Sequence, residues 1–154
     1  MAVDQQPIIY LDACCLNRPF DDQTQDRIRL ETEAIVLIIR RLQTQEWLWL
    51  GSEVLDFEIE QTPDTERRLR VQLLAEFVYR SIEIGPAEED RARQLQALGF
   101  KLWDALHIAC AELGQADVFL TTDDKLLNLA RRLTGQLNIQ VENPLTWLQE
   151  VSKV

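Results

Sequence analysis

The chain has 154 residues, which is enough for one domain of ordinary size and too few for two full cores. Hydrophobic residues make up 46% of it and charged residues 27%, a composition typical of globular proteins and not of disordered or membrane proteins. With 16 Lys and Arg against 26 Asp and Glu, the formal net charge of −10 argues against a protein that coats duplex DNA or an anionic membrane by bulk charge, but it leaves room for a local site that takes a phosphate-bearing substrate.

Short β-rich apolar runs alternate with longer stretches of helical periodicity along the chain. The predicted strands are residues 8–11, 47–50, 81–84, 118–121 and 139–141. The predicted helices are residues 23–45, 53–61, 65–77, 86–98, 102–113, 124–133 and a short last helix that begins at Pro144. This alternation favours an α/β fold, with a mostly parallel central sheet of about five strands and helices on both of its faces.

Several features indicate where the protein works. The longest apolar run, residues 34–39, is far shorter than the roughly 18 residues that span a bilayer. Residues 1–7 lack the basic segment of a signal peptide. The three cysteines are Cys14, Cys15 and Cys110. An odd count with an adjacent pair is a poor disulfide framework, so we expect a cytoplasmic protein without a membrane partner and with one domain over residues 1–154.

Carboxylates follow two of the predicted strands. Asp12 comes directly after residues 8–11, and Asp123 and Asp124 come just after the fourth strand. If the strands are parallel, both carry their acids to the edge of the sheet where ligands bind in α/β folds. Asp104 stands in the first turn of a predicted helix and lies off its apolar stripe, so packing alone does not account for it.

Each acid also has a structural explanation when it is taken alone. An Asp after a strand is often a turn former or a helix N-cap, and Asp104 can complement the helix dipole. Several carboxylates gathered at one edge, however, would repel one another unless they were protonated or bridged by a cation. Oxygen ligands of this kind suit Mg²⁺ or Mn²⁺, which can activate a water for an attack on phosphorus.

Four segments, in this order, resemble the motifs of the PIN domain family. They are Ile9-Tyr10-Leu11-Asp12, Ser52 with Glu58 six residues later, residues 102–109, and Phe119-Leu120-Thr121-Thr122-Asp123. The chain is similar to the single-domain bacterial VapC-type toxins over roughly residues 7–148. The resemblance implies a three-layer α/β/α PIN-like fold and a metal-dependent endoribonuclease whose products carry a 5′-phosphate and a 3′-hydroxyl. It also implies a small antitoxin protein that blocks the site, and homodimers are common in the family.

The resemblance further implies an acidic metal site that binds Mg²⁺ or Mn²⁺ as cofactor. Its four catalytic and metal-binding acids are Asp12, Glu58, Asp104 and Asp123. The second acid stays open, because Glu53 and Asp56 share the predicted helix of Glu58, which is chosen for its offset from Ser52.

The residues around the first and last acids fill supporting roles. The family often has a hydroxyl residue and a small polar residue after the first Asp, whereas this sequence has Ala13 and Cys14. We therefore expect Asn17 to supply the missing hydrogen bond. We expect Thr121 to support the last acid through its hydroxyl, and Asp124 to act as a helix N-cap or auxiliary ligand.

A ribonuclease also needs cations that hold the RNA backbone. Arg18, near the first acid, and Lys125, near the last, are the expected substrate-binding residues, and residues 17–22 are expected to form an ordered loop beside the site. Other candidates are Arg27, Arg29, Arg67, Arg68 and Arg70. Ion pairs on helix faces explain most of this second group.

Other chemistries fit the sequence less well. The only histidine, His107, is expected at the surface or partly packed, and the spacing of His107 and the cysteines lacks the paired knuckle of a zinc site. The four tryptophans are expected in the core or at a dimer contact rather than as base-stacking platforms. Two alternatives stay open: a non-catalytic PIN-like interaction or scaffold module, and a small phosphatase.

Overall fold

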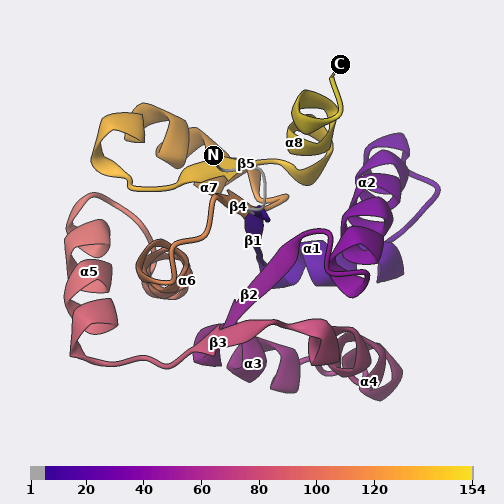
Figure 1. The fold of residues 1–154 in the computed structure, drawn as a ribbon, viewed down its shortest axis with the longest axis horizontal. Coiled ribbons are helices and arrows are strands. Elements are labelled where there is room, and N and C mark those ends of the chain that lie inside the picture. Colours follow the sequence, from indigo (N-terminus) through magenta and orange to yellow (C-terminus); the bar gives the residue numbers. More distant parts are fainter. Residues whose placement is uncertain (1–5, 154) are drawn as a thin grey trace.

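Residues 6–153, which the computed structural model describes, fold around one sheet of five parallel strands (Figure 1). The strands are β1 (Ile8–Leu11), β2 (Leu48–Ser52), β3 (Arg80–Ile82), β4 (Val118–Leu120) and β5 (Gln140–Glu142). Their order is β3-β2-β1-β4-β5, and every neighbouring pair is parallel. The chain builds the sheet from β1 outward to β3 and then returns to the other side of β1. The strand order therefore reverses between β1 and β4, the place where open parallel sheets bind ligands.

Helices cover both faces of the sheet. They are α1 (Ala13–Asn17), α2 (Asp26–Gln43), α3 (Glu53–Glu60), α4 (Thr65–Leu74), α5 (Pro86–Ala97), α6 (Leu102–Leu113), α7 (Asp124–Arg132) and α8 (Pro144–Val151), with 3-10 turns η1 (Arg18–Phe20), η2 (Ala75–Phe77) and η3 (Thr134–Gln136). In Figure 1, α1, α2 and α8 lie on one side of β1, and α5 and α6 lie on the other. The predicted three-layer α/β/α fold is confirmed.

The central strands are apolar on both faces because each face has its own core. Ile9 and Leu11 of β1 enter the core under α2 and α8, whereas Tyr10 between them enters the core under α5 and α6. All three side chains are fully buried. Burial on both faces is typical of parallel sheets and explains why the predicted strands are continuous apolar runs instead of alternating ones.

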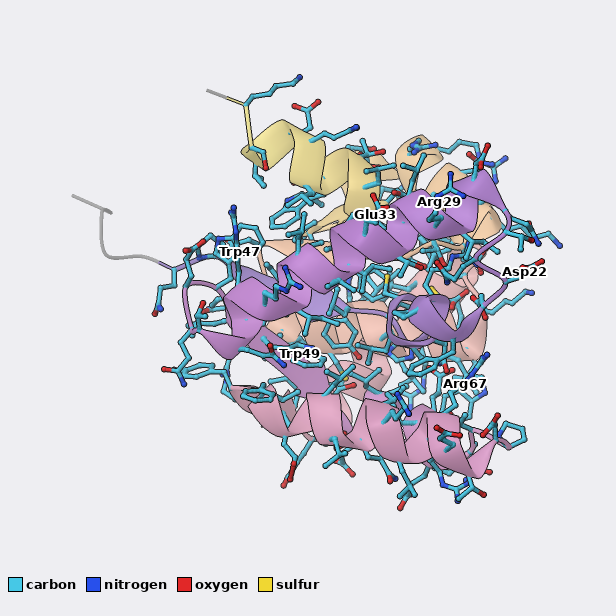
Figure 2. All side chains as sticks on the ribbon, turned by 90° about the vertical axis from the view of Figure 1, so that its right-hand side faces the viewer. Asp22, Arg29, Glu33, Trp47, Trp49 and Arg67 are labelled. Atoms are coloured by element: carbon cyan, nitrogen blue, oxygen red, sulfur yellow. The ribbon has the colours of Figure 1, made fainter. Side chains whose placement is uncertain are left out.

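Figure 2 shows α2 lying across one face of the molecule, with Arg29 and Glu33 on its exposed side. Beneath that layer, Trp47 contacts Trp147 of α8 edge to face, with ring centroids 5.0 Å apart. Three of the four tryptophans are buried in this core, as predicted. The prediction for Trp103 is wrong as far as the core is concerned, because its side chain is 45% exposed.

Most predicted elements are present within a few residues of their predicted bounds, and the main exception is the segment after β1. Residues 17–22 were expected to form a loop, but helix α1 and turn η1 occupy residues 13–20. Asp12 caps α1, because its carboxylate accepts a hydrogen bond from the backbone N–H of Ala13 at 2.8 Å. A five-residue helix is too short to show helical periodicity in a sequence. None of the helices within residues 6–153 has the length and apolar character needed to cross a bilayer.

Candidate active site

Asp12 stands at the reversal point of the sheet, directly after β1. Its backbone N–H donates to the carbonyl of Leu120 at 3.0 Å, which extends the ladder between β1 and β4 by one residue. Its buried carboxylate accepts a second hydrogen bond, 2.9 Å long, from the hydroxyl of Thr121. Both central strands therefore fix the position of this carboxylate.

Thr121 also links Asp12 to the residues that follow β4. The Thr121 hydroxyl oxygen accepts a hydrogen bond from the backbone N–H of Asp123 at 3.2 Å. The Asp123 carboxylate in turn accepts from the backbone N–H groups of Lys125 and Leu126 at 2.9 and 3.3 Å, as the N-cap of α7. The predicted supporting contact of Thr121 is thus present, and it reaches the first acid as well as the last.

Asp104 faces Asp123 across a small pocket between the first turns of α6 and α7. The pocket has a volume of about 100 Å³, and Lys101 and Lys125 also line it. Lys101 was not among the predicted substrate-binding residues, because only the fold brings the start of α6 beside the start of α7.

The surroundings of Asp104 strongly disfavour its negative charge. Burial, together with the charges of Asp12 and Asp123, raises the pKa of Asp104 to about 6, while the charge of His107 acts in the opposite direction. Mutual repulsion of this kind is what a bound cation removes. The predicted gathering of Asp12, Asp104 and Asp123 is therefore reflected in the electrostatics of the site.

Glu58 reaches the same place from α3. Its carboxylate is hydrogen-bonded to Nε2 of His107, and one oxygen each of Asp12 and Glu58 lies within 4.8 Å of the other and of a ring nitrogen of His107. The two alternative candidates for the second acid have other surroundings. Glu53 accepts a hydrogen bond from the backbone of Ile84, and Asp56 lines a separate groove against η2. Of the three candidate acids on α3, the structure brings Glu58 to Asp12.

The expectation that His107 lies at the surface is wrong, since its side chain is buried beneath the site. Its Nδ1 is 2.6 Å from the hydroxyl of Tyr10, which is 2.6 Å from the hydroxyl of Ser52. Although burial opposes the charged form, the hydrogen bond to Glu58 and the charge of Asp12 raise the pKa of His107. Both ring nitrogens have partners, so the geometry makes His107 a positioning residue for Glu58 and leaves metal ligation to the carboxylates.

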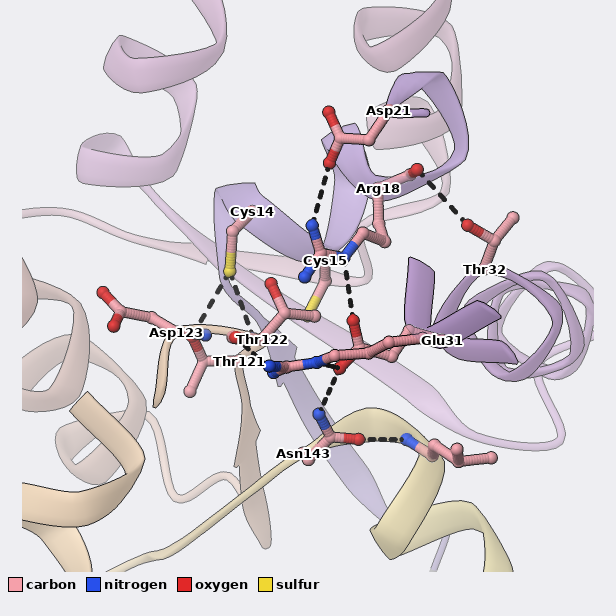
Figure 3. Close-up of polar contacts among 12 residues, drawn as sticks. Cys14, Cys15, Arg18, Asp21, Glu31, Thr32, Thr121, Thr122, Asp123 and Asn143 are labelled. Carbon is pink, nitrogen blue, oxygen red and sulfur yellow. Dashed lines mark hydrogen bonds and ion pairs between the residues drawn. The ribbon is translucent and has the colours of Figure 1, made fainter. Parts of the chain in front are cut away.

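Cys14, and not Asn17, contacts the first acid. The Cys14 sulfur lies 3.4 Å from Oδ2 of Asp12. It also lies 3.3 Å from the Thr121 hydroxyl and accepts a hydrogen bond from the backbone of Thr122 (Figure 3). The side-chain amide of Asn17 instead donates to the carbonyl of Ala13, because helix α1 turns it back along its own axis. The thiol of Cys14 thus takes the place of the small polar residue that the family often has at this position.

Two arginines near the site are engaged by a buried carboxylate on α2. Glu31 is 2% exposed and accepts hydrogen bonds from Nε of Arg18 at 2.9 Å and Nε of Arg27 at 3.2 Å (Figure 3). Arg18 also pairs with Asp21 at 3.2 Å. Arg27 holds Asp124 through two hydrogen bonds of 2.7 and 2.8 Å. Arg18 and Asp124, predicted to bind substrate and to support the site, therefore have structural partners, whereas Lys125 lines the acidic pocket.

The donor chemistry of the site fits a hard divalent cation. The groups that converge are carboxylates from four elements, and carboxylate oxygens are the preferred ligands of Mg²⁺ and Mn²⁺. The residues that would hold such an ion are Asp12, Glu58, Asp104 and Asp123.

Comparison with known proteins identifies a family and finds similar solved structures. A family model described as the PIN domain matches residues 9–132. A chain in the crystal structure of VapBC2 from Rickettsia felis, bound to a DNA fragment from its promoter, superposes with a TM-score of 0.58 and 11% sequence identity, over 88% of this chain and 98% of that chain. No curated protein sequence matches the chain.

Proposed function

Because the chain belongs to the PIN domain family, we propose that it is a Mg²⁺- or Mn²⁺-dependent endoribonuclease that acts as the toxin of a toxin–antitoxin pair. The observation that carries the proposal is the convergence of four carboxylates at the reversal point of the sheet, with the pKa of Asp104 raised to about 6. A surface of solvated acids would not build up such repulsion.

In the proposed mechanism the chain's own residues position the reaction. A bound divalent ion would lower the pKa of a water and neutralise charge on the scissile phosphate. Thr121 and Ala13 fix the Asp12 carboxylate through hydrogen bonds, and His107 fixes that of Glu58. Lys101 and Lys125 line the acidic pocket, and in this mechanism their ammonium groups would contact phosphate oxygens of the substrate.

The toxin role is supported by the fold that the chain shares with a chain of VapBC2, a protein whose structure includes promoter DNA. We propose a small antitoxin partner whose Arg or Lys side chains enter the acidic pocket, since the formal charge of this chain is −10. A homodimer is also proposed, through apolar side chains that α4 exposes, among them Leu69 and Leu73. The three free cysteines are consistent with the proposed cytoplasmic location.

Cleavage of RNA by the purified protein tests the proposal. We expect Mg²⁺ or Mn²⁺ to support cleavage, a chelator to abolish it, and Asp12→Asn to lower it by at least about a thousandfold while the protein stays folded. Asp90→Asn is the matched control, because it removes the same charge from an exposed position on α5. Wild-type rates in a folded Asp12→Asn protein would refute the site, and a wild type that binds no metal at millimolar concentration would favour the non-catalytic module.

A further inference from the structure

Two aromatic side chains lie exposed directly beside the acids. Phe57 immediately precedes Glu58 on α3, and Trp103 immediately precedes Asp104 on α6. The two rings stack on each other, with planes 6° apart and centroids 5.4 Å apart. Phe57 is 46% exposed and Trp103 is 45% exposed. About half of each side chain thus remains open to solvent while the stacking holds both rings in one orientation.

Packing of the fold does not account for this pair. Neither ring belongs to the two hydrophobic cores, to which α3 and α6 contribute other side chains. An aromatic ring left half in water gives up much of the free energy that its burial would provide. A pair of such rings, at the point where two helices deliver metal-binding acids, is a feature of the kind that marks a binding surface.

We propose that Phe57 and Trp103 form a stacking platform for an unpaired base of the RNA, next to the phosphate that is cut. The inference rests on the proposed function and adds a substrate subsite to it. Adjacent positions on a helix project from the same turn, so a strand whose phosphate lies at Glu58 and Asp104 has its neighbouring bases within reach of the two rings. Planar aromatic side chains accept the face of any base, which suits a subsite without sequence preference.

The charge of the site favours a base as the occupant. The chain carries a net −10, and Arg18 and Arg27 near the site are already paired with Glu31. A phosphate backbone therefore meets mainly Lys101 and Lys125 at the pocket. Stacking does not depend on charge, so it can supply the binding free energy that an acidic protein cannot obtain from phosphate contacts. Because stacking needs an unpaired base, the platform selects single-stranded over duplex RNA.

Intrinsic fluorescence offers a direct test, since Trp47, Trp49 and Trp147 are buried and Trp103 is the exposed tryptophan. A short single-stranded RNA is titrated into Asp12→Asn protein, in which no cleavage consumes the probe. We expect quenching of the fluorescence by this RNA, and much weaker quenching by a duplex or by an oligonucleotide of the same length with abasic sites. Trp103→Phe should keep most of the RNA affinity and lose the quenching.

Affinities of matched variants complete the test. Trp103→Leu should weaken binding of the single-stranded RNA by about fivefold to a hundredfold, the usual effect of losing one stacked base. In the cleaving protein the same change should raise KM more than it lowers kcat. Tyr79→Leu is the control, because Tyr79 is an exposed aromatic residue (61%) away from the acids, just before the edge strand β3. We expect it to leave both constants unchanged.

The outcomes separate this inference from the proposed function. If wild-type protein cuts RNA but Trp103→Leu and Tyr79→Leu bind and cut alike, the platform is refuted and the aromatic pair is left as a contact for a protein partner. Absence of quenching in the Asp12→Asn protein refutes it as well. Quenching in the Asp12→Asn protein together with weakened RNA binding by Trp103→Leu would support the platform. If the wild type nevertheless did not cut RNA, the proposed nuclease activity would be overturned.

Discussion

Replacing Asp104 with Asn should make the metal-free protein more stable and the metal-bound protein inactive. The pKa of Asp104 is about 6 in the folded protein against an ordinary value of 3.8. That difference corresponds to about 3 kcal/mol of unfavourable free energy for the charged carboxyl at pH 7. Because the side chain is partly exposed, solvent screening reduces the figure to about 1–2 kcal/mol. Asn has the shape of the neutral acid without its charge, so it removes this term.

The sign of the effect depends on pH in a defined way. A carboxyl with a raised pKa binds its proton more tightly in the folded state than in the unfolded state, so its contribution to stability is present below pH 4 and is lost as the pH rises through 6. The stability gained by Asp104→Asn should therefore be near zero at pH 4 and reach about 1–2 kcal/mol above pH 7. Comparing the two proteins cancels the titration of groups that they share.

Urea unfolding at several pH values, in a chelating buffer, measures this difference. Adding Mg²⁺ or Mn²⁺ should then reverse the order, because an ion at a hundred times its Kd stabilises the wild type by about 2.7 kcal/mol and has lost a ligand in the variant. Asp90→Asn on α5 serves as control and should show neither the gain nor the reversal. A stability difference that stayed constant from pH 4 to pH 8 would refute the reasoning, since it would mean that folding does not raise the pKa of Asp104.

Two further predictions concern the buried polar contacts around the site. His107→Leu leaves Tyr10 and Glu58 without their partner, so we expect the free energy of unfolding to fall by about 1–3 kcal/mol. The metal affinity, measured by calorimetry, and the cleavage rate should each fall about 10- to 100-fold. Normal metal affinity in the folded variant would exclude the positioning role. Glu31→Ala removes the carboxylate that pairs with Arg18 beneath the site, so urea unfolding should show a loss of about 3–5 kcal/mol, and a loss below about 1 kcal/mol would contradict the importance of this ion pair.

Local patterns in the sequence predict most of the fold. The strands before Asp12 and before Thr121 are short apolar runs between polar residues, and such runs can be recognised without knowing their neighbours. Strand β3 at the sheet edge is shifted by a residue or two from its predicted bounds, because Arg80 and Ser81 are exposed and give no apolar signal. Helix α1 was missed because its five residues are too few to show helical periodicity, although Asp12 caps it.

The sequence predicts those site residues whose position follows from the direction of parallel strands. It does not predict contacts between side chains that come from elements far apart in the chain. Parallel strands must bring Asp12 and Asp123 to one edge, so their meeting follows from fold class. The partners of His107 are Tyr10, 97 residues earlier on β1, and Glu58, 49 residues earlier on α3. The sequence around His107 contains no pattern that predicts these contacts. Arg18 lies close to Asp12 along the chain, yet Glu31 holds it, because α2 packs against η1.

The net charge of −10 now has a spatial interpretation. Four acids gather at one edge of the sheet, and Glu31 and Asp124 pair with Arg18 and Arg27, which would otherwise attract anions. Arg18 and Arg27 are therefore not free to contact phosphate, and without a bound divalent ion the repulsion from the carboxylates would oppose the attraction of Lys101 and Lys125 for phosphate. In the proposed nuclease, binding and cleavage would therefore be coupled, because the ion that activates the water would also supply the charge that attracts the substrate. An acidic surface around such a site limits non-specific RNA binding and leaves a basic protein segment as the natural competitor for the same pocket.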